Sequence, residues 1–284
     1  MSLKVGIVGA AGYAGAELIR LVLGHPEFEL VAITSNADAD QPLSAVYPSF
    51  AGVSDLVFTT HDAPELKSCD AVFLAVPHTA AMAQVPALLA AGVSCIDLSA
   101  DYRLSDPVTF EAWYAAEHTS PELLKTRAFG LPELFSQDLE TAASDHADGK
   151  PVLVACAGCY PTATSLAAAP AVRAGSVAQS GPVIVDAISG VTGAGKSCNA
   201  RTHFCSADEN LEAYGVGKHR HTPEIEQILG LTDRVVFTPH LAPLKRGLLS
   251  TVTMPLAPQA LDTLTLEDVV DHYKKFYAGR TFVC

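Results

Sequence analysis

The feature that most constrains the fold is a strand, a glycine loop and a helix at the start of the chain. Residues 4–8 (KVGIV) form a short apolar run typical of a buried strand, and a helix-like segment follows from residue 16. Between them, Gly9, Gly12 and Gly15 form a G-x-x-G-x-x-G pattern, which permits a tight turn and a close approach of backbone N–H groups to a pyrophosphate. A tight strand–helix junction without a ligand is the alternative, but this context favours a dinucleotide site.

The first part of the chain continues this alternation. Apolar runs of strand length recur at residues 29–35, 71–77 and 93–99, and residues 79–92 form a helix-like segment that ends at Gly92. The order strand, helix, strand predicts an α/β fold in which a Rossmann-type parallel sheet has right-handed crossovers.

A polar, acidic stretch at residues 136–150 marks the expected domain boundary. We therefore expect a Rossmann-type nucleotide-binding domain over residues 1–148 and a second domain over residues 149–284, the latter for substrate binding, catalysis and oligomerisation. Strand-like and helix-like runs mix in the second part, which predicts an α+β domain with a mixed sheet. The expected strands are PVLVA, PVIVDAIS, RVVFTPHL and LLSTVTM, and the expected helices are PTATSLAAAPAVRAG, PEIEQILG and TLEDVVDHYKKFYAG.

Composition excludes several classes of protein. The chain has 284 residues with 49% hydrophobic and 17% charged side chains, which is too apolar for a disordered chain. Its net charge is -13 with no basic cluster, so we expect no nucleic-acid partner and no membrane surface as partner, and no apolar run is long enough to span a bilayer. Seven cysteines at irregular spacing are typical of a reduced, cytoplasmic protein.

The end of the second expected strand bears on the choice of cofactor. NAD-binding units usually carry an acid there, whereas this chain has Thr34, Ser35 and Asn36, and its nearest acid is Asp38. Hydroxyl and amide groups suit a 2′-phosphate, so NADP(H) is the expected cofactor, although Ser35 and Asn36 also suit an ordinary turn. The cofactor residues expected from these loops and from the end of the strand at residues 71–77 are Gly9, Ala11, Gly12, Tyr13, Ala14, Gly15, Thr34, Ser35, Pro77 and His78.

Two cysteines in the segment VACAGCYPTATSLAAAP allow three kinds of site. A zinc site would require a second cysteine pair, which the chain lacks, so we expect no metal. A redox dithiol has the right spacing but not a thioredoxin-like context. The third possibility is a single nucleophile. Cys159 precedes a helix with Pro161 in its first turn, where free N–H groups favour a thiolate, whereas burial of Cys156 in a strand would raise its pKa.

Five segments of the chain together resemble the N-acetyl-γ-glutamyl-phosphate reductases, relatives of the aspartate-semialdehyde dehydrogenases. The segments are GAAGYAGAEL, AGCYPTAT, SGVTGAGK, GKHRHTPEIEQ and FTPHLAPLKRG. The resemblance covers essentially the whole chain, and GCYPTA and HRHTPE are its specific motifs. It implies NADPH-dependent reduction of an acyl phosphate to a semialdehyde in arginine biosynthesis, through a thioester on a cysteine that matches Cys159. It also implies a homo-oligomer, either a dimer or a tetramer.

The chain departs from the family pattern at three points. Ala157 stands where members usually have proline, and Cys156 stands at a position that the family does not use as a thiol. Members also continue some tens of residues past GRTFVC, and that tail returns to the first domain. We therefore expect either a fragment or a nucleotide-binding domain without its closing elements.

The remaining candidate residues surround the expected acyl phosphate. His219 and His221, at the start of a helix, are candidates for the acid–base, because histidine titrates near neutral pH; the residues alone do not choose between them, and the resemblance favours His219 slightly. Arg103 resembles the phosphate-contacting arginine of the semialdehyde dehydrogenases. Alternatives are the same chemistry on an aspartyl or carrier-linked aminoadipyl phosphate, or an NADP-binding regulator without turnover. The other expected substrate residues are Ser99, Lys196 and Arg246, and Gly190 and Gly193 join the expected cofactor residues.

Overall fold

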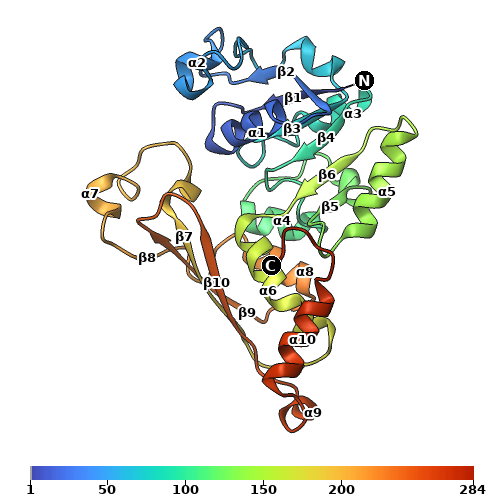
Figure 1. Cartoon of the computed structure of the whole chain (residues 1–284), viewed down its shortest axis with the longest axis vertical. Coiled ribbons are helices and arrows are strands. Elements are labelled where there is room, and N and C mark those ends of the chain that lie inside the picture. The colour runs from blue at the N-terminus through green and yellow to red at the C-terminus, as the bar shows by residue number, and fades with distance from the viewer. Residues whose placement is uncertain (1) are drawn as a thin grey trace. The chain divides into compact units, whose positions relative to one another are not determined.

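The computed structural model describes residues 2–284, which form two compact units (Figure 1). The first unit comprises the chain up to Gly130 together with Gln137–Ala157. The second comprises Leu131–Ser136 and Gly158–Cys284. Each unit has its own sheet.

The first unit is built on a six-stranded parallel sheet with the strand order β2-β1-β3-β4-β6-β5. Its strands are apolar runs, and Val5 and Ile7 of β1 are at most 1% exposed, as is typical of strands covered on both faces. The expected α/β class with a Rossmann-type sheet is therefore confirmed. The strands are β1 (Leu3–Val8), β2 (Phe28–Thr34), β3 (Ala71–Leu74), β4 (Ser94–Asp97), β5 (Ala128–Gly130) and β6 (Leu153–Cys156).

One expected helix of this unit is much shorter than predicted. Residues 79–92 contain only α3 (Val85–Ala90), and the residues before it form turns. The buried Asp101 carboxylate accepts the N–H groups of Thr79 at 2.6 Å and Met82 at 3.0 Å, which holds this segment away from helical geometry. The other helices are α1 (Tyr13–Leu23), α2 (Leu43–Val46), α4 (Pro107–Tyr114) and α5 (Ser136–Ala147), with 3-10 turns η1 (Pro48–Phe50), η2 (Pro64–Ser68) and η3 (Pro121–Lys125).

The chain leaves the first unit later than the expected boundary at residues 148–149. The polar stretch that marked the boundary forms the solvent-facing helix α5, which is polar because only Ala142 of it is buried. The next strand, β6, pairs in parallel with β4 and with β5, and its Leu153 and Ala155 are buried. The last strand of the parallel sheet thus follows the polar stretch, and the second unit resumes at Gly158.

The second unit has a four-stranded mixed sheet with the order β10-β7-β9-β8, as expected for this part. Helix α6 packs on β10 and on α8, and α8 packs on β9, so both helices cover one face of the sheet (Figure 1). No helix within residues 2–284 has the length and apolarity required to cross a bilayer. The strands are β7 (Val183–Gly190), β8 (Glu212–Ala213), β9 (Val235–Ala242) and β10 (Leu248–Thr253), and the helices are α6 (Cys159–Arg173), α7 (Phe204–Ala207), α8 (Thr222–Leu229), α9 (Pro258–Leu261) and α10 (Leu266–Phe276), with η4 at Val191–Ala194.

Candidate active site

Cys159 is the first residue of helix α6, and its side chain is exposed. Gly158 is the N-cap residue, and because glycine has no side chain it offers no oxygen to cap the first turn. Pro161 lies in that turn, where its missing N–H leaves no unmet bond. The positive end of the helix dipole favours an anion at this end, so the position of Cys159 suits a thiolate.

A buried carboxylate fixes the turn that presents Cys159. Glu224, in the first turn of α8, is 1% exposed, and its Oε1 accepts the Gly158 N–H at 2.8 Å. Sequence reasoning missed this residue. Its position on α8 was a usable signal, because Glu224 lies four residues before the buried Ile228 and therefore on the apolar face of the helix.

The two candidate histidines lie together at the start of α8. Their ring centroids are 4.9 Å apart. The helix begins at Thr222 with His221 as its N-cap, one residue earlier than the sequence pattern indicated. Aromatic rings enclose the His219 imidazole edge to face, with Tyr160, Tyr214 and Phe237 at centroid distances of 5.7, 5.3 and 5.2 Å.

This environment decides the charge and the tautomer of His219. Burial, with the neighbouring Arg220 in second place, lowers the pKa of His219 to about 4, so the ring is neutral at pH 7. Its Nδ1 accepts the backbone N–H of His221 at 3.2 Å. Because an amide can only donate, the neutral ring carries its proton on Nε2. His219 is thus a neutral hydrogen-bond donor.

Two tyrosines complete the cluster, and sequence reasoning missed both. The Tyr214 hydroxyl donates to the Tyr160 hydroxyl at 3.2 Å, and the Tyr160 hydroxyl donates to the His240 carbonyl at 3.2 Å. Burial raises the pKa of Tyr214, and the bond to Tyr160 and the nearby Cys159 thiol raise it further. The exposed Cys159, the neutral His219 and the two phenols therefore form one group within the second unit.

Cys156 has a different environment. It ends β6 in the first unit, where burial raises the pKa of its thiol to about 11. This confirms the expected direction of the shift. At pH 7 Cys156 is a protonated thiol, which is a poor nucleophile.

Arg103 and Ser99 form hydrogen bonds at the carboxyl ends of strands β4 and β6. The Arg103 side chain is buried; its Nε donates to the Cys156 carbonyl at 2.9 Å and its Nη2 to the Leu98 carbonyl at 2.7 Å. The Ser99 hydroxyl donates to Asp97 at 2.9 Å, and burial raises the pKa of Asp97 to about 6. Two N–H donors of Arg103, the arginine expected to bind phosphate, are thus hydrogen-bonded to backbone carbonyl groups.

The three glycines of the first loop have different roles. A Cβ on Gly9 would lie 2.4 Å from the Ala75 carbonyl oxygen, and its φ of 77° also excludes most side chains. A Cβ on Gly15 would lie 2.5 Å from the Ala10 Cα. A Cβ on Gly12 would meet only the Gly9 oxygen at 3.6 Å, so packing does not require this glycine. Open space at Gly12, the N-cap of α1, fits a bound pyrophosphate.

The other expected cofactor residues lie around the same edge of the sheet. Ala11 is buried and its carbonyl accepts the Tyr47 hydroxyl at 2.8 Å, while Tyr13 and Ala14 are exposed at the start of α1. Pro77 and His78 are exposed after β3. Ends of neighbouring parallel strands meet here, which is where such sheets bind ligands.

The end of β2 differs from the expectation in one respect. Thr34 is fully buried and hydrogen-bonds to His61 at 2.7 Å, so its hydroxyl is engaged. The Ser35 hydroxyl donates to Asp38 at 2.7 Å. Asp38, although four positions beyond the end of β2 in the sequence, is therefore close to that strand end in space.

The remaining candidates lie on two loops of the second unit. The Gly190 N–H donates to the Gly247 carbonyl at 3.0 Å, which joins the end of β7 to the turn between β9 and β10. A Cβ on Gly190 would lie 2.6 Å from the Leu244 oxygen, so backbone packing accounts for this glycine. Three further candidates are exposed on these loops: Gly193, Lys196 and Arg246.

Comparison with known proteins agrees with this arrangement. Residues 4–142 match the family model described as the NAD binding domain of semialdehyde dehydrogenase, and residues 159–284 match the one described as its dimerisation domain. The chain belongs to the semialdehyde dehydrogenase family. Members of this family are oxidoreductases, which confirms the expected class of enzyme.

Within the semialdehyde dehydrogenase family, the chain is similar to curated proteins named N-acetyl-gamma-glutamyl-phosphate reductase. Those of Symbiobacterium thermophilum and Syntrophobacter fumaroxidans are each 46% identical to it, over 288 and 286 residues, which cover 100% and 99% of this chain and 79% of each relative. The resemblance noted from the motifs is thereby confirmed.

Solved structures share the fold. Aspartate semialdehyde dehydrogenase from Candida albicans, solved with NADP, superposes with a TM-score of 0.66 at 16% identity, over 89% of this chain and 71% of that one. Aspartate semialdehyde dehydrogenase II from Vibrio cholerae gives 0.67 at 14% identity, over 96% and 78%.

Proposed function

We propose that this chain catalyses the NADPH-dependent reductive dephosphorylation of N-acetyl-L-glutamyl 5-phosphate to N-acetyl-L-glutamate 5-semialdehyde, a step of arginine biosynthesis. The observation that carries the proposal is the exposed Cys159 at the start of α6, grouped with a neutral His219 and two tyrosines. The names of the 46% identical relatives support the choice of substrate.

The first step is an acyl transfer to sulfur. The Cys159 thiolate bonds to the acyl carbon, the bond from that carbon to the phosphate oxygen breaks, and inorganic phosphate leaves. A reduced nicotinamide, when bound, supplies the hydride that reduces the thioester. Breaking the carbon–sulfur bond then releases the semialdehyde and restores the thiolate, so that one NADPH and one proton are consumed in each turnover.

His219 stabilises the oxygen on which charge develops. Its Nε2–H is the free donor of a ring that stays neutral at working pH, which suits a group aimed at an oxyanion. A ring with a pKa near 4 is a weak base at pH 7, so we assign proton exchange to His221, whose ring is 4.9 Å away. His219→Asn and His221→Asn should each lower the maximal rate by about 10²–10⁴-fold.

NADP(H) is the proposed cofactor, bound at the Gly9–Gly15 loop with its 2′-phosphate near Ser35 and Asn36. The structure of the Candida albicans neighbour, solved with NADP, supports this choice. Asp38 is the feature that opposes it, because a carboxylate there would accept a ribose hydroxyl of NAD. Fluorescence titration decides the question: NADPH should bind more tightly than NADH, and equal or tighter binding of NADH would refute the proposal.

The phosphoryl group is assigned to Arg103, with Ser99, Lys196 and Arg246 as further ligands. Arg103 has five N–H donors, so the bonds to the Cys156 and Leu98 carbonyls do not use all of them. The two units are proposed to act as a nucleotide-binding and a catalytic domain of a homo-oligomer, a dimer or a tetramer, since the second unit matches a dimerisation domain. Light scattering measures that oligomer directly.

One assay tests the function as a whole. Purified protein should reduce NADP⁺ in the presence of inorganic phosphate and N-acetylglutamate semialdehyde, and far more slowly with aspartate semialdehyde. Preference for aspartate semialdehyde would support the proposed reaction type but refute N-acetylglutamate semialdehyde as the substrate. Absence of phosphate-dependent reduction with either aldehyde would refute the function.

A further inference from the structure

A cation that the preceding assignments do not use lies against Tyr214, one of the two phenols grouped with Cys159. The guanidinium carbon of Arg201 is 5.1 Å from the centre of the Tyr214 ring. Tyr214 donates its hydroxyl to Tyr160, which directly follows Cys159 in α6. One aromatic ring thus separates a positive charge from the first turn of the helix that carries the thiol.

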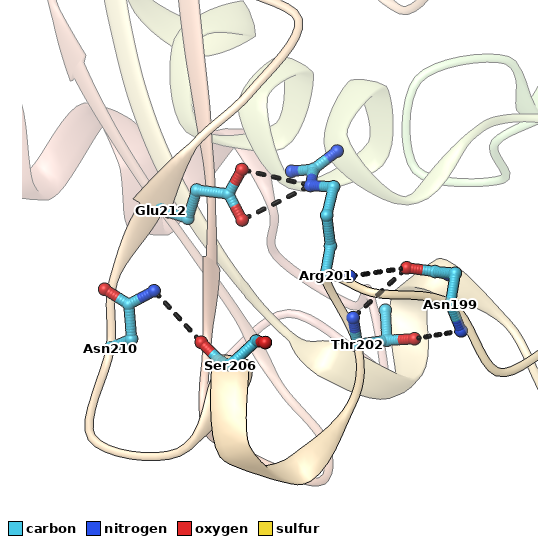
Figure 2. A network of polar contacts seen from close by, with 6 residues as sticks. All are labelled: Asn199, Arg201, Thr202, Ser206, Asn210 and Glu212. Atoms are coloured by element: carbon cyan, nitrogen blue, oxygen red, sulfur yellow. Dashed lines mark hydrogen bonds and ion pairs between the residues drawn. The ribbon is translucent and has the colours of Figure 1, made fainter.

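The loop before α7 holds the backbone of this arginine, and strand β8 holds its side chain (Figure 2). The Asn199 side-chain oxygen accepts the backbone N–H groups of Arg201 at 3.0 Å and Thr202 at 3.1 Å. At the other end, Arg201 Nε faces both carboxylate oxygens of Glu212, at 3.0 and 3.2 Å. Both dashed contacts from Glu212 end on Nε, and none of the contacts drawn in Figure 2 reaches the two terminal nitrogens of the guanidinium.

Stability alone is a weak reason for this arrangement. The Arg201 and Glu212 side chains are 45% and 43% exposed, and an ion pair of that exposure contributes only about 0–1 kcal/mol. Its electrostatic effect on the site is clearer. Burial, the bond to Tyr160 and the Cys159 thiol all raise the pKa of Tyr214, and Arg201 opposes them. Arg201 and Cys159 therefore act on the same phenol.

We infer that Arg201 binds the carboxylate of the acyl substrate, the anionic group at the opposite end from the reacting acyl phosphate. This inference rests on the proposed function and names a subsite of the same active site. A guanidinium fork matches the two oxygens of a carboxylate, whereas a phosphoryl group that must leave is served by other cations. In a chain of net charge -13, a fixed cation near the thiol also draws an anionic substrate to it.

Alkylation of Cys159 tests the charge without requiring turnover. Iodoacetate carries a carboxylate and iodoacetamide does not, so the ratio of their rates at Cys159 reports a cation near the thiol, while any change in thiolate content cancels. Arg201→Ala should lower the iodoacetate to iodoacetamide ratio by about 3- to 10-fold. Arg201→Lys should lower it less, and Lys274→Ala, a change at an exposed position of α10, should leave it unchanged. Peptide mass mapping restricts the measurement to Cys159. An unchanged ratio in Arg201→Ala would overturn the inference.

Steady-state kinetics in the oxidative direction test which anion is bound. Arg201→Ala should raise the KM for the semialdehyde by about 10- to 100-fold and leave the KM for inorganic phosphate within about 2-fold. Glu212→Gln removes the ion pair and keeps the guanidinium, so it should raise the KM for the semialdehyde much less. A rise in the phosphate KM instead, or equal effects of both variants, would refute the carboxylate assignment.

The two experiments separate this inference from the proposed function. If the parent protein turned over no semialdehyde, the proposed function would fail, and the alkylation ratio would still decide whether Arg201 attracts an anion to Cys159. Circular dichroism melts of Arg201→Ala and Arg201→Lys show whether both variants are folded. Arg201→Lys keeps the charge without the fork, so a folded Lys variant with a raised semialdehyde KM supports binding through the fork.

Discussion

Removing the buried carboxylate of Glu224 should disturb both the stability of the second unit and the reactivity of its thiol. Glu224 Oε1 accepts the N–H of the buried Gly158 at 2.8 Å, and the side chain is 1% exposed. Glu224→Ala leaves that N–H without its acceptor and opens a cavity, which together should cost about 2–4 kcal/mol of unfolding free energy. Glu224→Gln is the matched control, because it keeps the volume and an acceptor oxygen and should cost less than about 1 kcal/mol.

Two assays follow this perturbation. Urea denaturation monitored by far-UV circular dichroism reports the free energy of unfolding, and iodoacetamide labelling mapped to Cys159 reports the geometry of the turn. We expect Glu224→Ala to be less stable and to label more slowly, because its loosened turn no longer holds the thiol against the first amides of α6. If Glu224→Ala matched the parent in both assays, the bond to Gly158 would not be what orders the site.

Three further predictions concern charge, the glycine loop and the sheet end. The pKa of His219 falls to about 4 in the folded state, so the unfolded chain takes up a proton at this histidine before the folded protein does. The free energy of unfolding should therefore be highest above pH 6.5 and fall toward pH 4, by at most about 3 kcal/mol. Denaturation of His219→Asn should lack this fall. Gly12→Ala should fold normally yet bind nicotinamide cofactor weakly in titrations, whereas Gly15→Ala should lower the melting temperature. Arg103→Ala should lose stability in addition to raising the phosphate KM, and unaltered melting would show that its bonds to the Cys156 and Leu98 carbonyls are unimportant.

Local patterns along the chain predicted most of the fold. Continuous apolar runs identified β1 to β4, because strands buried on both faces leave no alternation to obscure them. The order of those strands and β6 does not follow from such runs. Residues 136–150 have the polarity of a linker, yet they form α5, since a helix on the surface of a sheet is polar on most of its faces.

The candidate site could be predicted in part. Motif and helix position identified Cys159, and the distinction from Cys156 agrees with the thiol pKa of about 11 that burial produces there. Tyr214 and Arg201 lie 55 and 42 positions beyond Cys159 in the sequence. They reach its surroundings through tertiary contacts, which no local spacing encodes. Glu224 was within reach of sequence reasoning, because an acid on the apolar face of α8 requires a buried partner.

The most direct test of the account is whether an acyl group forms on Cys159 and on no other residue. With N-acetylglutamate semialdehyde and NADP⁺ but no phosphate, the thioester cannot be cleaved by its normal acceptor, so mixing should give a burst of NADPH equal to the number of active sites. Intact-mass and peptide mass spectrometry should then locate the acyl group on Cys159. Cys156→Ser should keep the burst and Cys159→Ser should lose it. An acyl group on Cys156, or an undiminished burst in Cys159→Ser, would contradict the assignment of the nucleophile.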